Sequence, residues 1–227
     1  MKKVLFFLLL YSSSLHLCAQ EGKIIMELQS FDHIKGFDGI SIELIKSNEN
    51  KAEISGANTT KVAIVNNKGT LKIRMKIDKI FSGYRTFVKL YYTDNLKIID
   101  VNEDAQIYSN DVIVQDILDV RAQESGELNL KCQTEQLLAK AVTGGDILLK
   151  GFTNNQDIVI NTGGDYNGQE FKSKFTTISV NAGGNASIYA TKYVKADVKA
   201  GGTVKVYGNP EKMDEKTVFG GKVERIE

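Results

Sequence analysis

The feature that most constrains the fold is a short repeat in the second half of the chain, centred on two small residues. We take the second small residue of each copy as a marker, and successive markers are 19, 19, 20, 18 and 19 residues apart. The six markers are Gly126, Gly145, Gly164, Gly184, Gly202 and Gly221. Self-similarity at a fixed short period is the signature of a repeat architecture.

Apolar and polar residues alternate on both sides of each marker. Around Gly184, for example, Ile178 and Val180 precede the glycine, and Ala186 and Ile188 follow it, with polar residues between. Alternation with period two is typical of a strand with one buried face. Glycine suits a tight corner because it adopts a positive φ without steric cost. Each repeat is therefore predicted to be a strand, a tight corner and a second strand.

A unit of about 19 residues is too short for a separate sheet domain, but it fits one coil of a β-solenoid. Equivalent side chains of neighbouring coils would then stack roughly 4.8 Å apart. In the alternative, a β-sandwich of hairpins, the turns would vary in length and the inward positions would not align. We expect an all-β fold, with a β-solenoid of about six coils over residues 101–227.

Residues 21–100 follow a different pattern. Segments 37–44, 52–55, 61–65, 71–75, 88–92 and 96–101 are predicted to be strands, and residues 76–86 a loop. We interpret this part as an N-terminal antiparallel β unit that covers one end of the solenoid, because a bare terminal coil exposes a strand edge. Residues 102–108 are interpreted as a degenerate first coil without glycines.

Residues 1–20 are typical of a secretory signal: Lys2 and Lys3 precede an apolar run, and Ala19 offers a small residue for cleavage. We expect an exported chain that begins near Gln20, located in the periplasm, on the outer surface or in the medium. The signal is too short for a membrane span, and no span is expected after its removal. Lipid attachment at Cys18 is the less favoured alternative, because a lipobox has small residues just before the cysteine.

The composition limits which partners the chain can bind and which chemistry it can perform. Removal of the signal, residues 1–20, takes away Lys2 and Lys3 and leaves 27 basic and 28 acidic residues. The mature chain therefore has no basic footprint for nucleic acid. Cys132 and His33 are then the only cysteine and histidine. We expect Cys132 to be a small buried hydrophobe, and a lone His33 is weak evidence for a metal or a base. No cofactor is expected.

Two sets of residues are candidates for a site. Asp146 and Asp165 directly follow their markers and would lie on adjacent coils, where carboxylates can bridge Ca²⁺ or perform acid–base work. The simpler interpretation, which we favour, is that they bond the local backbone beside a glycine turn. Tyr189 and Tyr207 share an outward position five after the marker and form a candidate contact patch.

Several motifs resemble a known family. FDGISIELIK from Phe37, NNKGTLKIRM from Asn66 and VKLYYTDNLKIIDV from Val88, followed by the Gly-Gly repeats, resemble the auto-transporter adhesin, head GIN domain, family of Bacteroidetes. The resemblance extends from about Phe31 to the end of the chain. The family's turns are typically Gly-Ser-Gly, whereas here they are Gly-Gly or Ser-Gly.

The resemblance implies a right-handed parallel β-helix similar to pectin-lyase folds, a cell-surface or periplasmic location and a role in adhesion. It transfers no catalytic residue, and it weakly implies a homo-trimer. We therefore expect a non-catalytic surface or periplasmic binding module whose partner is a glycan or a surface protein. The alternative is a polysaccharide-acting enzyme of pectin-lyase-like fold.

Overall fold

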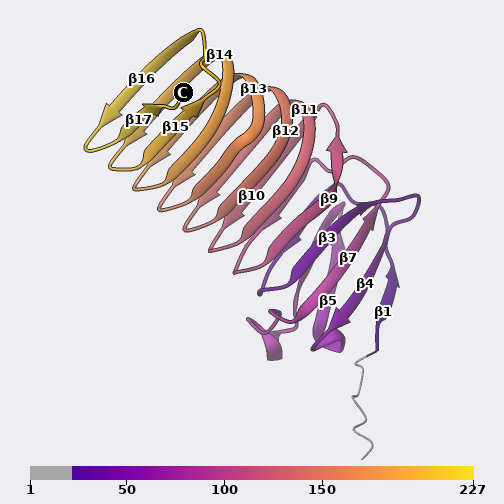
Figure 1. Cartoon of the computed structure of the whole chain (residues 1–227). Coiled ribbons are helices and arrows are strands. Elements are labelled where there is room, and N and C mark those ends of the chain that lie inside the picture. Colours follow the sequence, from indigo (N-terminus) through magenta and orange to yellow (C-terminus); the bar gives the residue numbers. More distant parts are fainter. Residues whose placement is uncertain (1–21) are drawn as a thin grey trace, which may run out of the picture.

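The computed structural model describes residues 22–227 and shows an elongated stack of β-strand coils (Figure 1). The predicted signal, with Cys18, lies outside the described residues. Seventeen strands form one continuous sheet, wound into a β-solenoid of about 7 turns with a spacing of about 19 residues. None of the helices in the described part of the chain is long and apolar enough to span a membrane.

The repeats form the solenoid as predicted. Each coil pairs in parallel with the next, and Val180 pairs with Val198 in the same sheet. The alignment of the inward positions is therefore confirmed, and the hairpin sandwich is excluded. The strands of this region are β10 (Ile117–Gln123), β11 (Glu127–Val142), β12 (Asp146–Asn161), β13 (Asp165–Asn181), β14 (Asn185–Lys199), β15 (Thr203–Tyr207), β16 (Lys212–Val218) and β17 (Lys222–Arg225).

The glycine corners line one edge of the stack, and their structure corrects one detail of the sequence interpretation. The two residues before each marker hold positive φ angles, such as Thr143 at 50° and Gly144 at 72°, and of the markers only Gly202 has one too. The marker Gly145 is needed for a different reason: a Cβ there would lie 2.2 Å from the carbonyl oxygen of Ala122 on the preceding coil. The marker therefore permits close backbone approach, and its partner provides the turn.

On the opposite edge, β11 to β14 curve without interruption from one side of the stack to the other (Figure 1). Buried hydroxyl and amide side chains occupy the interior of this bend and bond to one another. Thr134 Oγ1 donates to Thr153 Oγ1 at 2.9 Å, and Gln156 Nε2 donates to Thr176 Oγ1 at 2.9 Å. These bonds satisfy polar groups that would otherwise be costly to bury.

The solenoid continues into the N-terminal half. Its strands are β1 (Ile24–Glu27), β2 (His33–Gly36), β3 (Ser41–Lys46), β4 (Lys51–Gly56), β5 (Val62–Asn67), β6 (Thr70–Met75), β7 (Thr86–Tyr92), β8 (Ile98–Val101) and β9 (Gln106–Val114). β8 and β9 form the coil without glycines that was predicted around residues 102–108. β2 and β3 form a further coil, because β2 pairs in parallel with β8 and β3 with β9.

The unit that covers this end is mixed rather than wholly antiparallel. β6 and β7 pair in parallel with β2 and β3 and so keep the direction of the coils. Only the outermost strands are reversed: β5 is antiparallel to β6, β4 to β7, and β1 to β4. The sheet is thus continued by one more parallel layer, β6 with β7, before its direction changes.

At the other end of the stack, polar and charged side chains protect the open strand edge against pairing with another strand. At the inward positions of the last coil, Glu215, Thr217 and Arg225 replace the apolar residues of earlier coils, and all three are exposed. Inward-pointing polar and charged residues discourage the addition of another strand at an open edge. The last fully buried apolar side chains are Val204 and Val206 on β15, and the last coil adds only the partly buried Met213 and Val223 to the core.

Candidate functional site

The acidic candidates lie side by side on consecutive coils. Asp146 pairs in register with Asp165 on one side and with Glu127 on the other. The amide of Asn185 donates to Asp165 Oδ1 at 3.0 Å, and that of Gln106 donates to Glu127 Oε2 at 3.0 Å. Neutral amides thus bond the two outer carboxylates of the run.

The electrostatics of this run are unfavourable for three full charges. Partial burial, followed by the charges of Asp165 and Glu127, raises the pKa of the Asp146 carboxyl above its ordinary value. Within residues 22–227, no group of three or more His, Cys, Asp and Glu side chains is arranged to hold a metal ion. We call this run of Glu127, Asp146 and Asp165 beside the corners the acidic ladder; its two outer members are bonded to amides.

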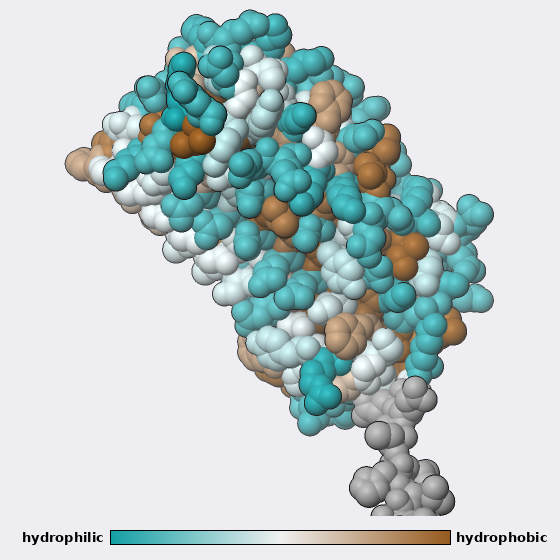
Figure 2. Space-filling model, viewed as in Figure 1, coloured by the Kyte–Doolittle hydropathy of each residue, from teal (hydrophilic) through white to brown (hydrophobic). Residues whose placement is uncertain are grey.

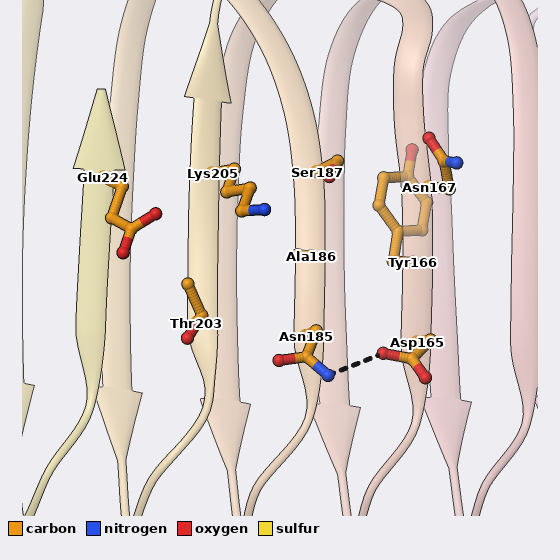
Figure 3. Close-up of a pocket in the computed structure, with 9 residues that line it drawn as sticks. All are labelled: Asp165, Tyr166, Asn167, Asn185, Ala186, Ser187, Thr203, Lys205 and Glu224. Carbon is orange, nitrogen blue, oxygen red and sulfur yellow. Dashed lines mark hydrogen bonds between the residues drawn. The ribbon is translucent and has the colours of Figure 1, made fainter. Parts of the chain in front are cut away.

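A shallow polar hollow of about 430 Å³ lies next to this ladder, over β13, β14, β15 and β17 (Figure 3). Figure 3 shows the Asp165–Asn185 hydrogen bond near the corners, with Lys205 projecting from the middle of its strand. The hollow is lined by Asp165, Tyr166, Asn167, Asn185, Ala186, Ser187, Thr203, Lys205 and Glu224. Its donors and acceptors are suited to hydrogen bonding with a polar partner.

Tyr189 and Tyr207 lie further along the same strands. They pair directly in register, and both are partly exposed. The Lys172 ammonium lies 5.8 Å from the centre of the Tyr189 ring, within the range of a cation–π contact. With Gln169, Gly208, Asn209, Ile226 and Glu227, the two tyrosines line a second hollow of about 460 Å³.

The two hollows belong to one surface, because outward residues alternate along each strand. We call the outward residues of the first halves of β13 and β14, together with those of β15 and β17, the side face. It carries amides, hydroxyls and charges near the corners and the tyrosine pair near the bend. Figure 2 shows a mainly hydrophilic surface in this view, with apolar side chains in separate small groups.

A second aromatic pair was missed in the sequence. Phe175 pairs with Tyr193 on the opposite side of the solenoid, and Phe175 is 46% exposed. The Tyr193 hydroxyl donates to Asp214 Oδ2 at 2.7 Å. Each residue stands nine positions before its marker glycine. Counting further back from the markers would therefore have found the pair.

The two isolated chemical candidates have ordinary surroundings. Cys132 is fully buried, and burial raises the pKa of its thiol to about 12, so it stays protonated. His33 contacts Asp32, whose other carboxylate oxygen lies 2.6 Å from Lys97. The hydrogen bond from Lys97 is the main cause of the lowered pKa of Asp32. These contacts describe a surface ion-pair cluster.

Solved structures share this architecture. A putative adhesin from Bacteroides fragilis has a TM-score of 0.79 and 17% identity, and the match covers 90% of this chain and 96% of that chain. A putative adhesin from Parabacteroides distasonis has a TM-score of 0.75, 17% identity and the same coverage. A putative lipid binding protein from Parabacteroides distasonis has a TM-score of 0.68 and 15% identity, covering 91% and 96%. At these identities the likeness shows the fold alone.

No curated protein sequence matches the chain. A family model does match, and it covers residues 30–210, from just before β2 to beyond β15. That span includes the tyrosine pair, the acidic ladder and all but the last coil. The chain therefore belongs to the family described as "Putative auto-transporter adhesin, head GIN domain".

Proposed function

We propose that this protein is an exported, non-catalytic binding module that uses its side face to contact a glycan or a surface protein. The observation that carries the proposal is the direct pairing of Tyr189 and Tyr207 beside a polar hollow on that face. Aromatic rings bind through their faces, and nearby amides and hydroxyls fix orientation. The adhesin names of the family and of its structural relatives support the same function class.

The rival function, a polysaccharide-acting enzyme, is not favoured. Such an enzyme needs an acid and a base, or a metal, placed around one substrate bond. The outer carboxylates of the acidic ladder are bonded to amides, and the hollow beside it is open and shallow. The arrangement offers a polar contact surface instead.

The test compares the native protein with a Tyr189→Ala, Tyr207→Ala double variant on glycan arrays and in cell-adherence assays. We expect the double variant to lose binding while its melting curve is unchanged, because both side chains are partly exposed. Tyr193→Ala, a tyrosine on the opposite side of the solenoid, is the matched control and should bind normally. Equal binding by the native protein and the double variant would remove the tyrosines from the proposal.

Incubation with pectin and other acidic glycans, with and without Ca²⁺, separates the rival function. Steady formation of unsaturated products, lost in Asp146→Asn or Asp165→Asn, would establish the enzyme in place of the binding module. N-terminal sequencing of exported material tests the processing route. A chain that begins near Gln20 supports plain cleavage, and a diacylglyceryl group on Cys18 supports lipid attachment.

A further inference from the structure

The capped end of the solenoid presents an apolar loop to solvent. The loop comprises residues 76–85, between β6 and β7, and lies at the end of the stack where the reversed strands are (Figure 1). Four large side chains in it are exposed: Ile77 by 80%, Ile80 by 52%, Phe81 by 56% and Tyr84 by 58%. Grouped exposed apolar side chains of this size mark an interaction surface more often than chance.

The loop is held in place by a buried carboxylate. Asp38 is only 3% exposed and accepts hydrogen bonds from the backbone N–H groups of Met75 at 2.9 Å and Phe81 at 3.1 Å. The N–H of Gly83 donates to the Asp38 carbonyl at 3.0 Å, and the Tyr84 hydroxyl donates to Asp104 at 3.0 Å. The apolar side chains are thus displayed by a fixed backbone.

Cations without an ion-pair partner surround these apolar side chains. Among residues 22–227, no carboxylate lies within 4.0 Å of the charged groups of Lys72, Arg74, Lys76, Lys79 and Arg85. Residues 76–85 contain three cations, Lys76, Lys79 and Arg85, and one carboxylate, Asp78, which bonds Lys61. The loop therefore has a local positive charge.

A hollow of about 450 Å³ beside the loop combines both properties. It is lined by Phe37, Asp38, Val65, Asn67, Lys72, Arg74, Ile80 and Glu103. Burial, followed by the charge of Asp38, raises the pKa of the Glu103 carboxyl above its ordinary value. Apolar side chains and unpaired cations therefore meet at one place.

We propose that this end of the protein docks on an anionic lipid surface. Ile77, Ile80 and Phe81 would enter the interfacial region, and the flanking lysines and arginines would contact lipid phosphates. A membrane accommodates a projecting apolar loop, whereas a protein partner would need a matching groove. The loop lies at one end of the long axis, so docking would leave the side face accessible (Figure 1). The inference does not depend on the proposed function.

The absence of tryptophan from the chain allows a direct test. Phe81→Trp would place a single tryptophan in the loop of the full chain, in a Cys18→Ala background so that no acyl chain contributes. We expect its fluorescence to shift to the blue on addition of phosphatidylcholine vesicles that contain phosphatidylglycerol. Vesicles of phosphatidylcholine alone should give a smaller shift, and salt should weaken the response.

Phe219→Trp is the matched control. Phe219 is 87% exposed and, like Phe81, has a positive φ, but it lies at the last corner, at the other end of the stack. Its fluorescence should not change with either vesicle. Equal responses of the two tryptophans, or no response of the one in the loop, would overturn the proposal.

Co-sedimentation provides the second measurement. Ile77→Ser with Phe81→Ser should reduce binding to the phosphatidylglycerol vesicles at least tenfold, and Lys76→Gln with Lys79→Gln should reduce its salt dependence. Phe219→Ser should bind as the Cys18→Ala parent does. If the loop variants instead lose cell adherence while the parent does not bind vesicles, the loop contacts a protein or a glycan and the lipid proposal is wrong.

Discussion

Gly168 lies against the phenol ring of Tyr166, two residues earlier on β13: a Cβ on Gly168 would come within 2.6 Å of Tyr166 Cε1. At the equivalent positions the neighbouring coil β12 has Ile147 and Leu149, both buried. On β13 the larger Tyr166 therefore stands in place of Ile147. Gly168, which has no side chain, stands in place of Leu149. The Tyr166 hydroxyl donates to Gln156 Oε1 at 2.8 Å in the bend.

The first prediction concerns Gly168→Leu, which restores the column pattern of the repeats. A consensus argument predicts stabilisation, but the Tyr166 ring already occupies the space. We expect a loss of about 1–3 kcal/mol in the free energy of unfolding, the usual cost of overpacking. Urea denaturation measures it. Adding Tyr166→Ala should partly reverse the loss, and strict additivity of the two changes would contradict the packing explanation.

The second prediction separates the two glycines of a corner. Gly145→Ala would place a Cβ 2.2 Å from a backbone oxygen, so we expect a loss of about 2 kcal/mol or more. Gly163→Asn changes the turn glycine of the next corner, which has a φ of 72° and nothing within 4 Å of its added Cβ. Asparagine tolerates that conformation, so the cost should be below about 1 kcal/mol. Equal urea midpoints for the two variants would contradict the division of roles.

These corners show what the sequence could and could not predict. The pair of small residues and its period identified the corners, and the aligned apolar columns identified the solenoid. The pair alone does not reveal which residue approaches the previous coil, because that depends on the stacking. The coil of β2 and β3 was missed because β4 to β7 are inserted before the next coil, which breaks the spacing.

The sequence predicted some features of the candidate surfaces and not others. The adjacency of Tyr189 and Tyr207 followed from their shared position in the repeat, as did that of Asp146 and Asp165. The segment around residues 76–86 was predicted to be a loop, but its fixed shape was not. That shape depends on Asp38, which is about forty residues away in sequence and whose buried carboxylate has no periodic signal.

The third prediction tests the core directly. Ile188 is fully buried on β14 and pairs with Val206 on the next coil. Ile188→Ala should cost about 2–5 kcal/mol, as expected for a large-to-small change in a packed core. Its outward neighbour Ser187 is the control, and Ser187→Ala should change stability by less than about 0.5 kcal/mol. A negligible shift of the urea midpoint for Ile188→Ala would contradict its inward position.

The fourth prediction concerns the pH dependence of the acidic ladder. Burial and the charges of Asp165 and Glu127 raise the folded-state pKa of Asp146 above its unfolded value. Its contribution to stability is therefore present below the unfolded pKa, about 3.9, and is lost as the pH rises through the folded pKa. The amide introduced by Asp146→Asn stays neutral at every pH, so this variant should be more stable than the native protein at neutral pH. The gain should be only about 0.5 kcal/mol, because the carboxyl still reaches solvent, which screens its charge, and it should disappear in acid.

Urea midpoints at neutral and acidic pH measure this effect, and Asp214 provides a control of opposite sign. The hydrogen bond from Tyr193 is the main cause of the lowered pKa of Asp214. Its stabilising contribution is therefore present above the unfolded pKa and lost as the pH falls through the folded pKa. Asp214→Asn should destabilise the protein at neutral pH and have no effect in strong acid. If Asp146→Asn also destabilised the protein at neutral pH, the Asp146 carboxylate would have a favourable partner. A dependence of that loss on added Ca²⁺ would then identify the partner as a cation bridging Asp146 and Asp165.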